Sequence, residues 1–175
     1  VLGEISTGGR VDEVIACEAL VRTLAEREPS VLFHLARAYQ AKGRLEESAS
    51  VLVEGCRRAP DHVELAHECS TVLATLGRRD DARRVLDGLV ARRPADPKVH
   101  RRVALVLYVS LGDLAGAAEA YGRSADLEPD AFEPRQQQGF ILLELERPAE
   151  AAAALRDAIR RSPKAALAHS LLGRA

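Results

Sequence analysis

The sequence is poor in aromatic residues and contains neither tryptophan nor methionine. Its 175 residues include three Phe and three Tyr, although 47% of them are hydrophobic, so the core must be built from Ala, Leu and Val. A core of this composition favours helices. The length fits either one domain of ordinary size or an extended repeat array.

Long apolar runs and an excess of charge are also missing. The longest apolar run covers residues 103–109, far short of the roughly 20 residues that a membrane helix needs. The 25 basic and 26 acidic side chains give a net charge of −1, whereas a protein that binds a phosphate backbone needs a basic excess. We therefore expect no direct membrane insertion and no nucleic-acid partner.

Cysteines are few, and their number is odd. Cys17, Cys56 and Cys69 show no metal-type pair spacing, which predicts buried free thiols in a reducing compartment. Val1 opens no recognisable leader. We therefore expect a fragment or processed product whose native start is missing. The expected location is the cytoplasm, with export left open.

Prolines, in contrast, recur along the sequence at a nearly constant period. They are Pro60, Pro94, Pro129 and Pro163. Successive members lie 34, 35 and 34 residues apart. A fixed period of this length indicates repeated supersecondary units that stack on one another.

Segments aligned on these prolines share columns of small and large residues. The second helix of each unit is expected to carry a small residue at Ser48, Ala82, Ala117 and Ala151. A larger apolar residue follows four positions later, at Leu52, Leu86, Tyr121 and Leu155. The first helix carries the pairs Leu35-Ala36, Cys69-Ser70, Val103-Ala104 and Gln138-Gly139. The small member of each pair predicts a close approach of two helices.

The ends of the expected helices carry matching signals. Gly43, Gly77 and Gly112 are placed to end first helices with a positive φ. In the fourth unit Glu146 occupies the position of these glycines. Pro148 is expected there to interrupt the helical run and to start the second helix.

Charged and capping residues follow the same boundaries. Asp96 before Pro97 predicts an N-cap, and Asp130 with Glu133 resembles a capping box. Acidic residues open the second helices at Glu46-Glu47, Asp80-Asp81 and Glu150, and Arg pairs close them at Arg57-Arg58, Arg92-Arg93 and Arg160-Arg161. The Arg pairs are interpreted as solvated helix ends that complement the helix dipole.

With these columns the sequence resembles the tetratricopeptide repeat family, whose 34-residue signature is a helix pair with a closing proline. The early Trp of that family is replaced by Leu32, Ala66, His100 and Arg135. The resemblance covers nearly the whole chain and implies an all-α fold, an α-α superhelix (solenoid) of about four full helical hairpins. The predicted single array comprises a partial unit 1–28, repeats 29–60, 61–94, 95–129 and 130–163, and a partial unit 164–175. Residues 11–28 are expected to form the second helix of an upstream unit.

The family resemblance also implies a binding surface. In that family, stacking leaves a concave groove lined by the first helix of each unit. The residues expected there are Phe33, Arg37, Gln40, Glu64, His67, Thr71, Lys98, Arg101, Arg102, Leu105, Tyr108, Gln136, Gln137, Phe140 and Leu143. This mixture suits an extended or helical peptide with apolar anchors and acidic or polar flanks.

The basic part of this lining is open to two interpretations. Lys98, Arg101 and Arg102 could bind a partner's carboxylates, because Arg can donate two parallel hydrogen bonds to one carboxylate. The cluster could equally be a solvated basic helix face.

Catalytic and metal-binding patterns are weak. His62 and His67 are five residues apart, which does not place them on one face of a helix. The glycines serve helix ends, and no nucleophile constellation is recognisable. The sequence therefore predicts a protein that is not an enzyme and that needs no cofactor or metal.

Three functions follow, of which the first is favoured. The chain is expected to be a scaffold or adaptor that binds a partner segment and helps to assemble a complex. Alternatively, it is the substrate-recruiting arm of a larger enzyme. The third possibility is self-association through open repeat ends, where apolar residues would be uncovered at Val11, Val14, Ile15, Leu171 and Leu172.

Overall fold

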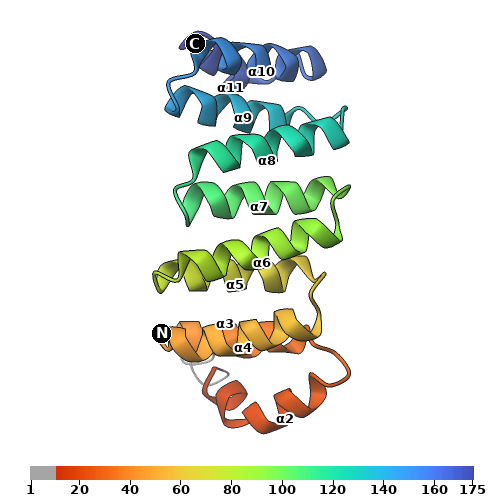
Figure 1. Cartoon of the computed structure of the whole chain (residues 1–175), viewed down its shortest axis with the longest axis vertical. Helices are drawn as coiled ribbons and strands as arrows, with labels where there is room; N and C mark the ends of the chain where they lie inside the picture. Colours follow the sequence, from red (N-terminus) through yellow and green to blue (C-terminus); the bar gives the residue numbers. More distant parts are fainter. Residues whose placement is uncertain (1–10) are drawn as a thin grey trace, which may run out of the picture. The chain divides into compact units, whose positions relative to one another are not determined.

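The structure, a computed structural model, describes residues 11–175, and every regular element within that range is a helix (Figure 1). The labelled helices are α2 (Glu18–Leu24), α3 (Val31–Ala41), α4 (Leu45–Arg58), α5 (Val63–Thr75), α6 (Arg79–Arg92), α7 (Pro97–Val109), α8 (Leu114–Leu127), α9 (Glu133–Glu144), α10 (Pro148–Arg161) and α11 (Ala166–Leu172). The predicted all-α class is confirmed. The chain divides between Arg92 and Arg93 into two compact units, α2–α6 and α7–α11.

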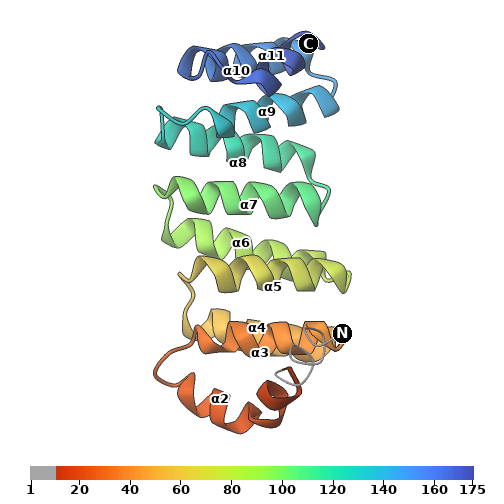
Figure 2. The same cartoon turned by 180° about the vertical axis from the view of Figure 1, so that it is seen from behind.

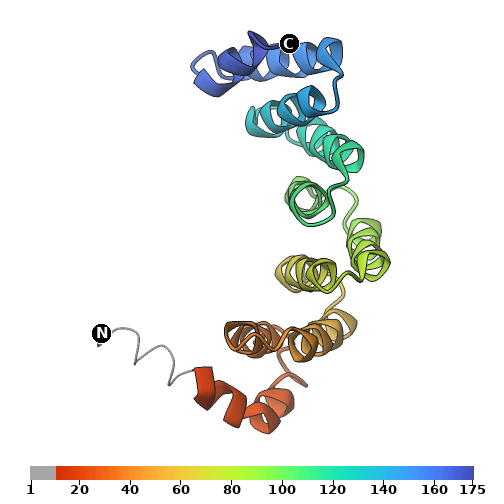
Figure 3. The same ribbon diagram turned by 90° about the vertical axis from the view of Figure 1, so that its left-hand side faces the viewer.

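Within each unit, every helix packs against the next one along the chain. In the first unit α3 pairs with α4 and α5 with α6, and α3 also contacts α5. In the second unit α7 pairs with α8 and α9 with α10, and α9 also contacts α11 (Figure 2). Seen along the helix axes, the two helices of a hairpin lie side by side (Figure 3). Within a unit, first helices are therefore also neighbours, as α3 and α5 and as α9 and α11 show.

The columns of small residues explain this packing. Ser48, Ala82, Ala117 and Ala151 have no exposed surface. Their larger partners Leu52, Leu86, Tyr121 and Leu155 are also buried. On the first helices Ala36, Ser70, Ala104 and Gly139 are buried in the same way. The predicted close approach of helices at these columns is confirmed.

The turns between the helices of each hairpin follow the glycine prediction. Gly43, Gly77 and Gly112 have φ values of 71°, 76° and 61°, a region that costs a residue with a Cβ about 1–2 kcal/mol. Glu146 takes the same conformation with a φ of 56°, so the fourth hairpin keeps the turn without a glycine. Pro148 occupies the first turn of α10 as expected.

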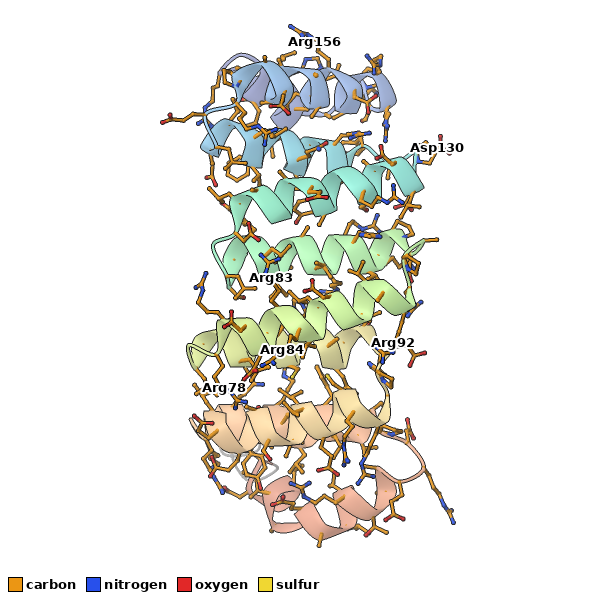
Figure 4. All side chains as sticks on the ribbon, viewed as in Figure 1. Arg78, Arg83, Arg84, Arg92, Asp130 and Arg156 are labelled. Atoms are coloured by element: carbon orange, nitrogen blue, oxygen red, sulfur yellow. The ribbon has the colours of Figure 1, made fainter. Side chains whose placement is uncertain are left out.

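The helix starts confirm one capping prediction and correct another. The Asp96 side chain accepts a hydrogen bond from the Lys98 N–H at 2.9 Å and caps α7. Asp130, however, does not cap α9, whose N-cap is Phe132. The loop makes one more turn, in which the Ala131 N–H donates to the Glu128 carbonyl. Figure 4 shows the Asp130 side chain at the outer end of this loop.

The first helical segment differs in part from its prediction. Residues 11–16 are helical, a turn interrupts the helix at Cys17, and α2 ends at Leu24. Cys17 is exposed, so its predicted burial is wrong; it lies in the turn before α2, a helix that has no buried residue. Glu18 ties α2 to α3 by accepting a hydrogen bond from the Tyr39 hydroxyl. That bond, together with one from Arg22, holds the pKa of Glu18 below its ordinary value.

Candidate partner-binding surfaces

The predicted contacts of the first unit lie on α3 and α5. On α3, the Arg37 guanidinium carbon lies 5.7 Å from the centroid of the Phe33 ring, within the range of a cation–π contact. Gln40 donates from its Nε2 to the Ser48 hydroxyl at 3.2 Å. Arg37 is exposed, whereas Phe33 and Gln40 are half-buried. This helix presents an aromatic ring with a cation beside it.

The α5 part of this surface is more polar. Glu64 is exposed, and His67 and Thr71 are half-buried. The Thr71 hydroxyl donates to the His67 carbonyl at 3.0 Å, so its hydrogen-bonding capacity is partly used inside the helix. His62 caps α5, because its Nδ1 accepts from the Leu65 N–H at 3.3 Å. Between residues 11 and 175, no group of three or more His, Cys, Asp and Glu side chains is arranged to hold a metal ion.

In the second unit, α7 carries an exposed stripe, which we define as Lys98, Arg102, Leu105 and Val109. Positions separated by three or four residues lie on one helix face. The two cations stand toward the start of α7 and the two apolar side chains toward its end. Leu105 is 37% and Val109 68% exposed. The stripe therefore offers positive charge and uncovered apolar surface on one helix.

The predicted cluster of three cations is smaller in the structure. Arg101 forms an ion pair with Glu128, the residue that follows α8. Its side chain is 32% exposed. The pair joins the two helices of the third repeat, so Arg101 is already engaged with a carboxylate of the chain itself.

Tyr108 and Phe140 connect α7 to α9. Their ring centroids are 6.1 Å apart at an interplanar angle of 80°, an edge-to-face contact between aromatic rings. Loss of hydration and then a hydrogen bond to Glu144 raise the pKa of Tyr108. The structure thus brings together two predicted contact residues that are 32 positions apart in the sequence.

The remaining predicted contacts lie on α9. Gln136 is 8% exposed and is not accessible as predicted, because the neighbouring helices cover that face of α9. Gln137 is half-buried. Phe140 and Leu143 are also half-buried and pack against a core cluster that includes Leu171 of α11. Leu171 was expected to be uncovered, and it is 3% exposed.

Two exposed residues of the second unit were missed by the sequence reasoning. Val109 follows Tyr108 directly, and Leu167 on α11 is 52% exposed. In the repeat alignment, Leu167 of the partial last unit corresponds to Lys98 of the third repeat. Both lie two positions before the place where the family has its early Trp. Extending the repeat register to residues 164–175 would have found it.

A network of charges around Asp157 holds α9 and α10 together. Asp157 accepts from Arg135 at 2.9 Å and from Arg160 and Arg161 at 2.7 Å each. Burial alone would raise the pKa of Asp157, but the hydrogen bond from Arg160 and the nearby guanidinium charges outweigh it and lower the pKa. Arg161 also donates to the Ala131 carbonyl at 3.0 Å. Its interpretation as a solvated helix end is therefore wrong.

A shallow pocket of about 360 Å³ opens beside this network. Its lining residues are Arg135, Gln138, Leu142, Glu150, Ala153, Ala154 and Asp157. None of these residues is a predicted contact. The pocket's charged residues are also engaged in ion pairs, Arg135 with Asp157 and Glu150 with Arg147. The first-helix surfaces are therefore the stronger candidates for binding.

Comparison with known families then identifies the repeat. A family model described as Tetratricopeptide repeat matches residues 70–134 and 137–175, and a second model of the same description matches residues 29–62. The chain belongs to the tetratricopeptide repeat family. These matches include all of α3 and α7 but leave out residues 63–69 of α5 and residues 135–136 of α9. No curated protein sequence matches this tetratricopeptide repeat protein.

Solved structures confirm the α-α solenoid class of this tetratricopeptide repeat protein. A crystal structure of MamA protein is 18% identical, with 93% of this chain and 88% of that chain covered and a TM-score of 0.65. YrrB is 18% identical, with 96% and 86% covered and a TM-score of 0.62. MamA from Desulfovibrio magneticus RS-1 is 20% identical, with 92% and 94% covered and a TM-score of 0.58. Among the described residues, no helix has the length and apolar character needed to cross a membrane.

Proposed function

We propose that this chain is a non-catalytic scaffold that holds a segment of a partner protein against the first helices of its repeats. Its family and fold support a role in protein–protein interaction. YrrB, a structural neighbour, is described as a TPR protein with an unusual peptide-binding site. The observation that carries the proposal is the exposed stripe on α7.

The stripe specifies the chemistry of the partner segment. Leu105 and Val109 are uncovered, and Tyr108, which lies between them in the sequence, contacts Phe140. An apolar side chain that packs on Leu105 and Val109 would remove apolar surface from water. Lys98 and Arg102 precede them on the same face. The partner segment therefore carries apolar anchors and an adjacent acidic flank.

Peptide selection followed by affinity measurement tests this assignment. Peptides enriched from a random display library on the immobilised chain are measured against Leu105→Ser combined with Val109→Ser. We expect this double variant to weaken binding about tenfold or more, equivalent to about 1.4 kcal/mol. Arg102→Ala should weaken it severalfold and reduce its salt dependence. Arg102 is preferred to Arg101 because Arg101→Ala also breaks the pair with Glu128.

Two matched controls come from second helices. Val53→Ser removes an apolar side chain that is 43% exposed on α4, and Arg156→Ala removes an exposed cation of α10 that Figure 4 labels. Both should leave peptide affinity and helical content unchanged, because exposed positions contribute little to stability. Equal affinity of the selected peptides for the stripe variant and the wild type would reject the assignment.

Self-association is a second candidate that one observation favours. Leu20 and Leu24 on α2 are 59% and 50% exposed, an unusual exposure for two neighbouring Leu residues on a helix face. If this face joins two copies of the chain, sedimentation equilibrium will show a dimer that Leu20→Ser with Leu24→Ser abolishes. A strict monomer at high concentration removes this candidate.

A further inference from the structure

The pocket between α9 and α10 lies where another repeat has apolar core. Three aligned positions of the first repeat hold side chains that are at most 1% exposed, namely Leu32, Leu35 and Val51. The same positions of the fourth repeat hold Arg135, Gln138 and Ala154, and all three line the pocket of about 360 Å³. Two polar side chains and one small apolar side chain thus replace three branched apolar ones. The pocket is therefore a consequence of this repeat's own sequence.

The acidic groups of the pocket wall are already engaged with arginines. Asp157 accepts hydrogen bonds from three guanidinium groups, as described above. Both carboxylate oxygens of Glu150 accept from Arg147, at 2.7 and 2.6 Å. A charged ligand would have to compete with these partners, whereas an uncharged ligand leaves every pair intact. The pocket therefore favours an uncharged ligand.

Arg135 presents a flat surface to the pocket. Its Nε donates to Asp157 at 2.9 Å, one terminal nitrogen donates to Gln138 at 2.9 Å, and the other terminal nitrogen donates to Asp126. The donors of a guanidinium point outward in its plane, so these bonds engage its edge at all three nitrogens. The side chain is nevertheless 21% exposed. It therefore meets a ligand chiefly through its planar face and its aliphatic stem, and both suit an aromatic ring.

The remaining lining is apolar, and the pocket is open on one side. Leu142 and Ala154 are buried, whereas Ala153 is exposed at the rim. Sites for free small molecules measure roughly 300 to 1,000 Å³ and enclose most of the ligand. This pocket has the volume of a small site but covers only one side of a ring. It therefore suits a side chain whose polypeptide backbone binds outside the pocket.

We propose that this pocket receives an aromatic side chain, Trp or Tyr, of a partner polypeptide. The ring packs on Arg135 and on the apolar floor of Leu142 and Ala154. The exposed carboxylate of Glu150 at the rim is an acceptor for the indole N–H or the phenol O–H. Aromatic side chains seated in pockets contribute much of the binding energy at protein interfaces. The site shares no residue with the exposed stripe on α7.

Titration of a tryptophan peptide with the folded full chain tests the site. The chain contains no tryptophan, so tryptophan fluorescence reports the peptide alone. A blocked Gly-Ser-Trp-Ser-Gly peptide should bind saturably with a dissociation constant of about 1 mM, as expected for one anchor side chain. Matching peptides with Lys or Asp in place of Trp should not displace it. Displacement by either would contradict an uncharged ligand.

Free indole distinguishes a side chain from a small molecule. Indole carries the same ring without a backbone, so it should bind more weakly than the peptide. Saturable binding of indole without binding of the peptide would overturn the assignment to a partner polypeptide.

Variants place the peptide in the pocket. Ala153→Leu fills the rim from an exposed position and should weaken peptide binding about tenfold or more. Ala115→Leu, the same change at an exposed position of α8 outside the pocket, should leave binding unchanged. Arg135→Lys keeps the charge but removes the plane, and should weaken binding about threefold. Circular dichroism confirms that each variant is folded. Equal affinity of the peptide for Ala153→Leu and the wild type overturns the proposal, as does the absence of saturable binding to the wild type.

Discussion

Replacement of Gly139 by alanine is the sharpest test of the packing between helices. Gly139 stands in the column of small residues where the other repeats have Ala36, Ser70 and Ala104. From the sequence, alanine would be an ordinary choice at this position. In the structure, however, a Cβ on Gly139 would lie 2.6 Å from Cγ and 2.8 Å from Cδ2 of Leu155. Leu155 is fully buried, and side chains in a close-packed interior move only by displacing their neighbours.

Two opposing effects set the size of the change. Alanine in a helix interior is favoured over glycine by about 1 kcal/mol. Inserting a methyl group into a packed core costs about 1–3 kcal/mol. The net loss is therefore between zero and about 2 kcal/mol, and the urea midpoint should fall by up to about 1 M. Urea titration followed by circular dichroism measures this shift.

Gly88→Ala provides the matched control. Gly88 lies in the interior of α6, and its added Cβ would meet only the Arg92 guanidinium at 3.4 Å. This variant should gain up to about 1 kcal/mol, since only the helix preference acts. If Gly139→Ala gains as much as Gly88→Ala, the close approach of α9 and α10 does not limit that position and the reasoning fails.

Three further predictions follow from the same structure. Asp157→Ala should lower the unfolding free energy by about 1–3 kcal/mol near neutral pH. Because the folded-state pKa of Asp157 is lowered, its contribution is present above about pH 4 and is lost as the pH falls through the folded value. The difference between wild type and variant should therefore shrink in acid urea titrations. Glu146→Gly should stabilise the chain by up to about 1 kcal/mol and Gly77→Ala should destabilise it, because both positions have a positive φ, which glycine adopts without strain. Melting temperatures that shift in the same direction for both variants would contradict this. Ala117→Leu at a fully buried site should cost about 1–3 kcal/mol or prevent folding, whereas Ala115→Leu at an exposed site of the same helix should be neutral in thermal melts.

Much of the fold could be predicted because it depends on local chemistry. A glycine after a first helix, a small residue at a fixed repeat position and a closing proline each favour a conformation of the few residues around them. Each of the four periodic prolines accordingly lies two residues after the end of a helix, namely α4, α6, α8 or α10. The capping box at Asp130 failed because a local motif does not say whether the loop will turn once more before the helix starts.

The exposure of the proposed contact residues could be predicted only in part. Helical spacing placed Lys98, Arg102 and Leu105 on one exposed face. It could not show that Arg101 pairs with Glu128 or that Gln136 is covered. Those outcomes depend on which residue of a neighbouring helix lies opposite each side chain.

The sequence by itself determined the helical class, the repeat length and the residues at which most helices begin and end, because these follow from backbone preferences and periodic burial. Only the tertiary structure decided which side chains meet across helices. It placed Tyr108 against Phe140 and three arginines around Asp157. The register and approach of packed helices set such contacts, and these arise from the combined shape of many side chains rather than from any single repeat column.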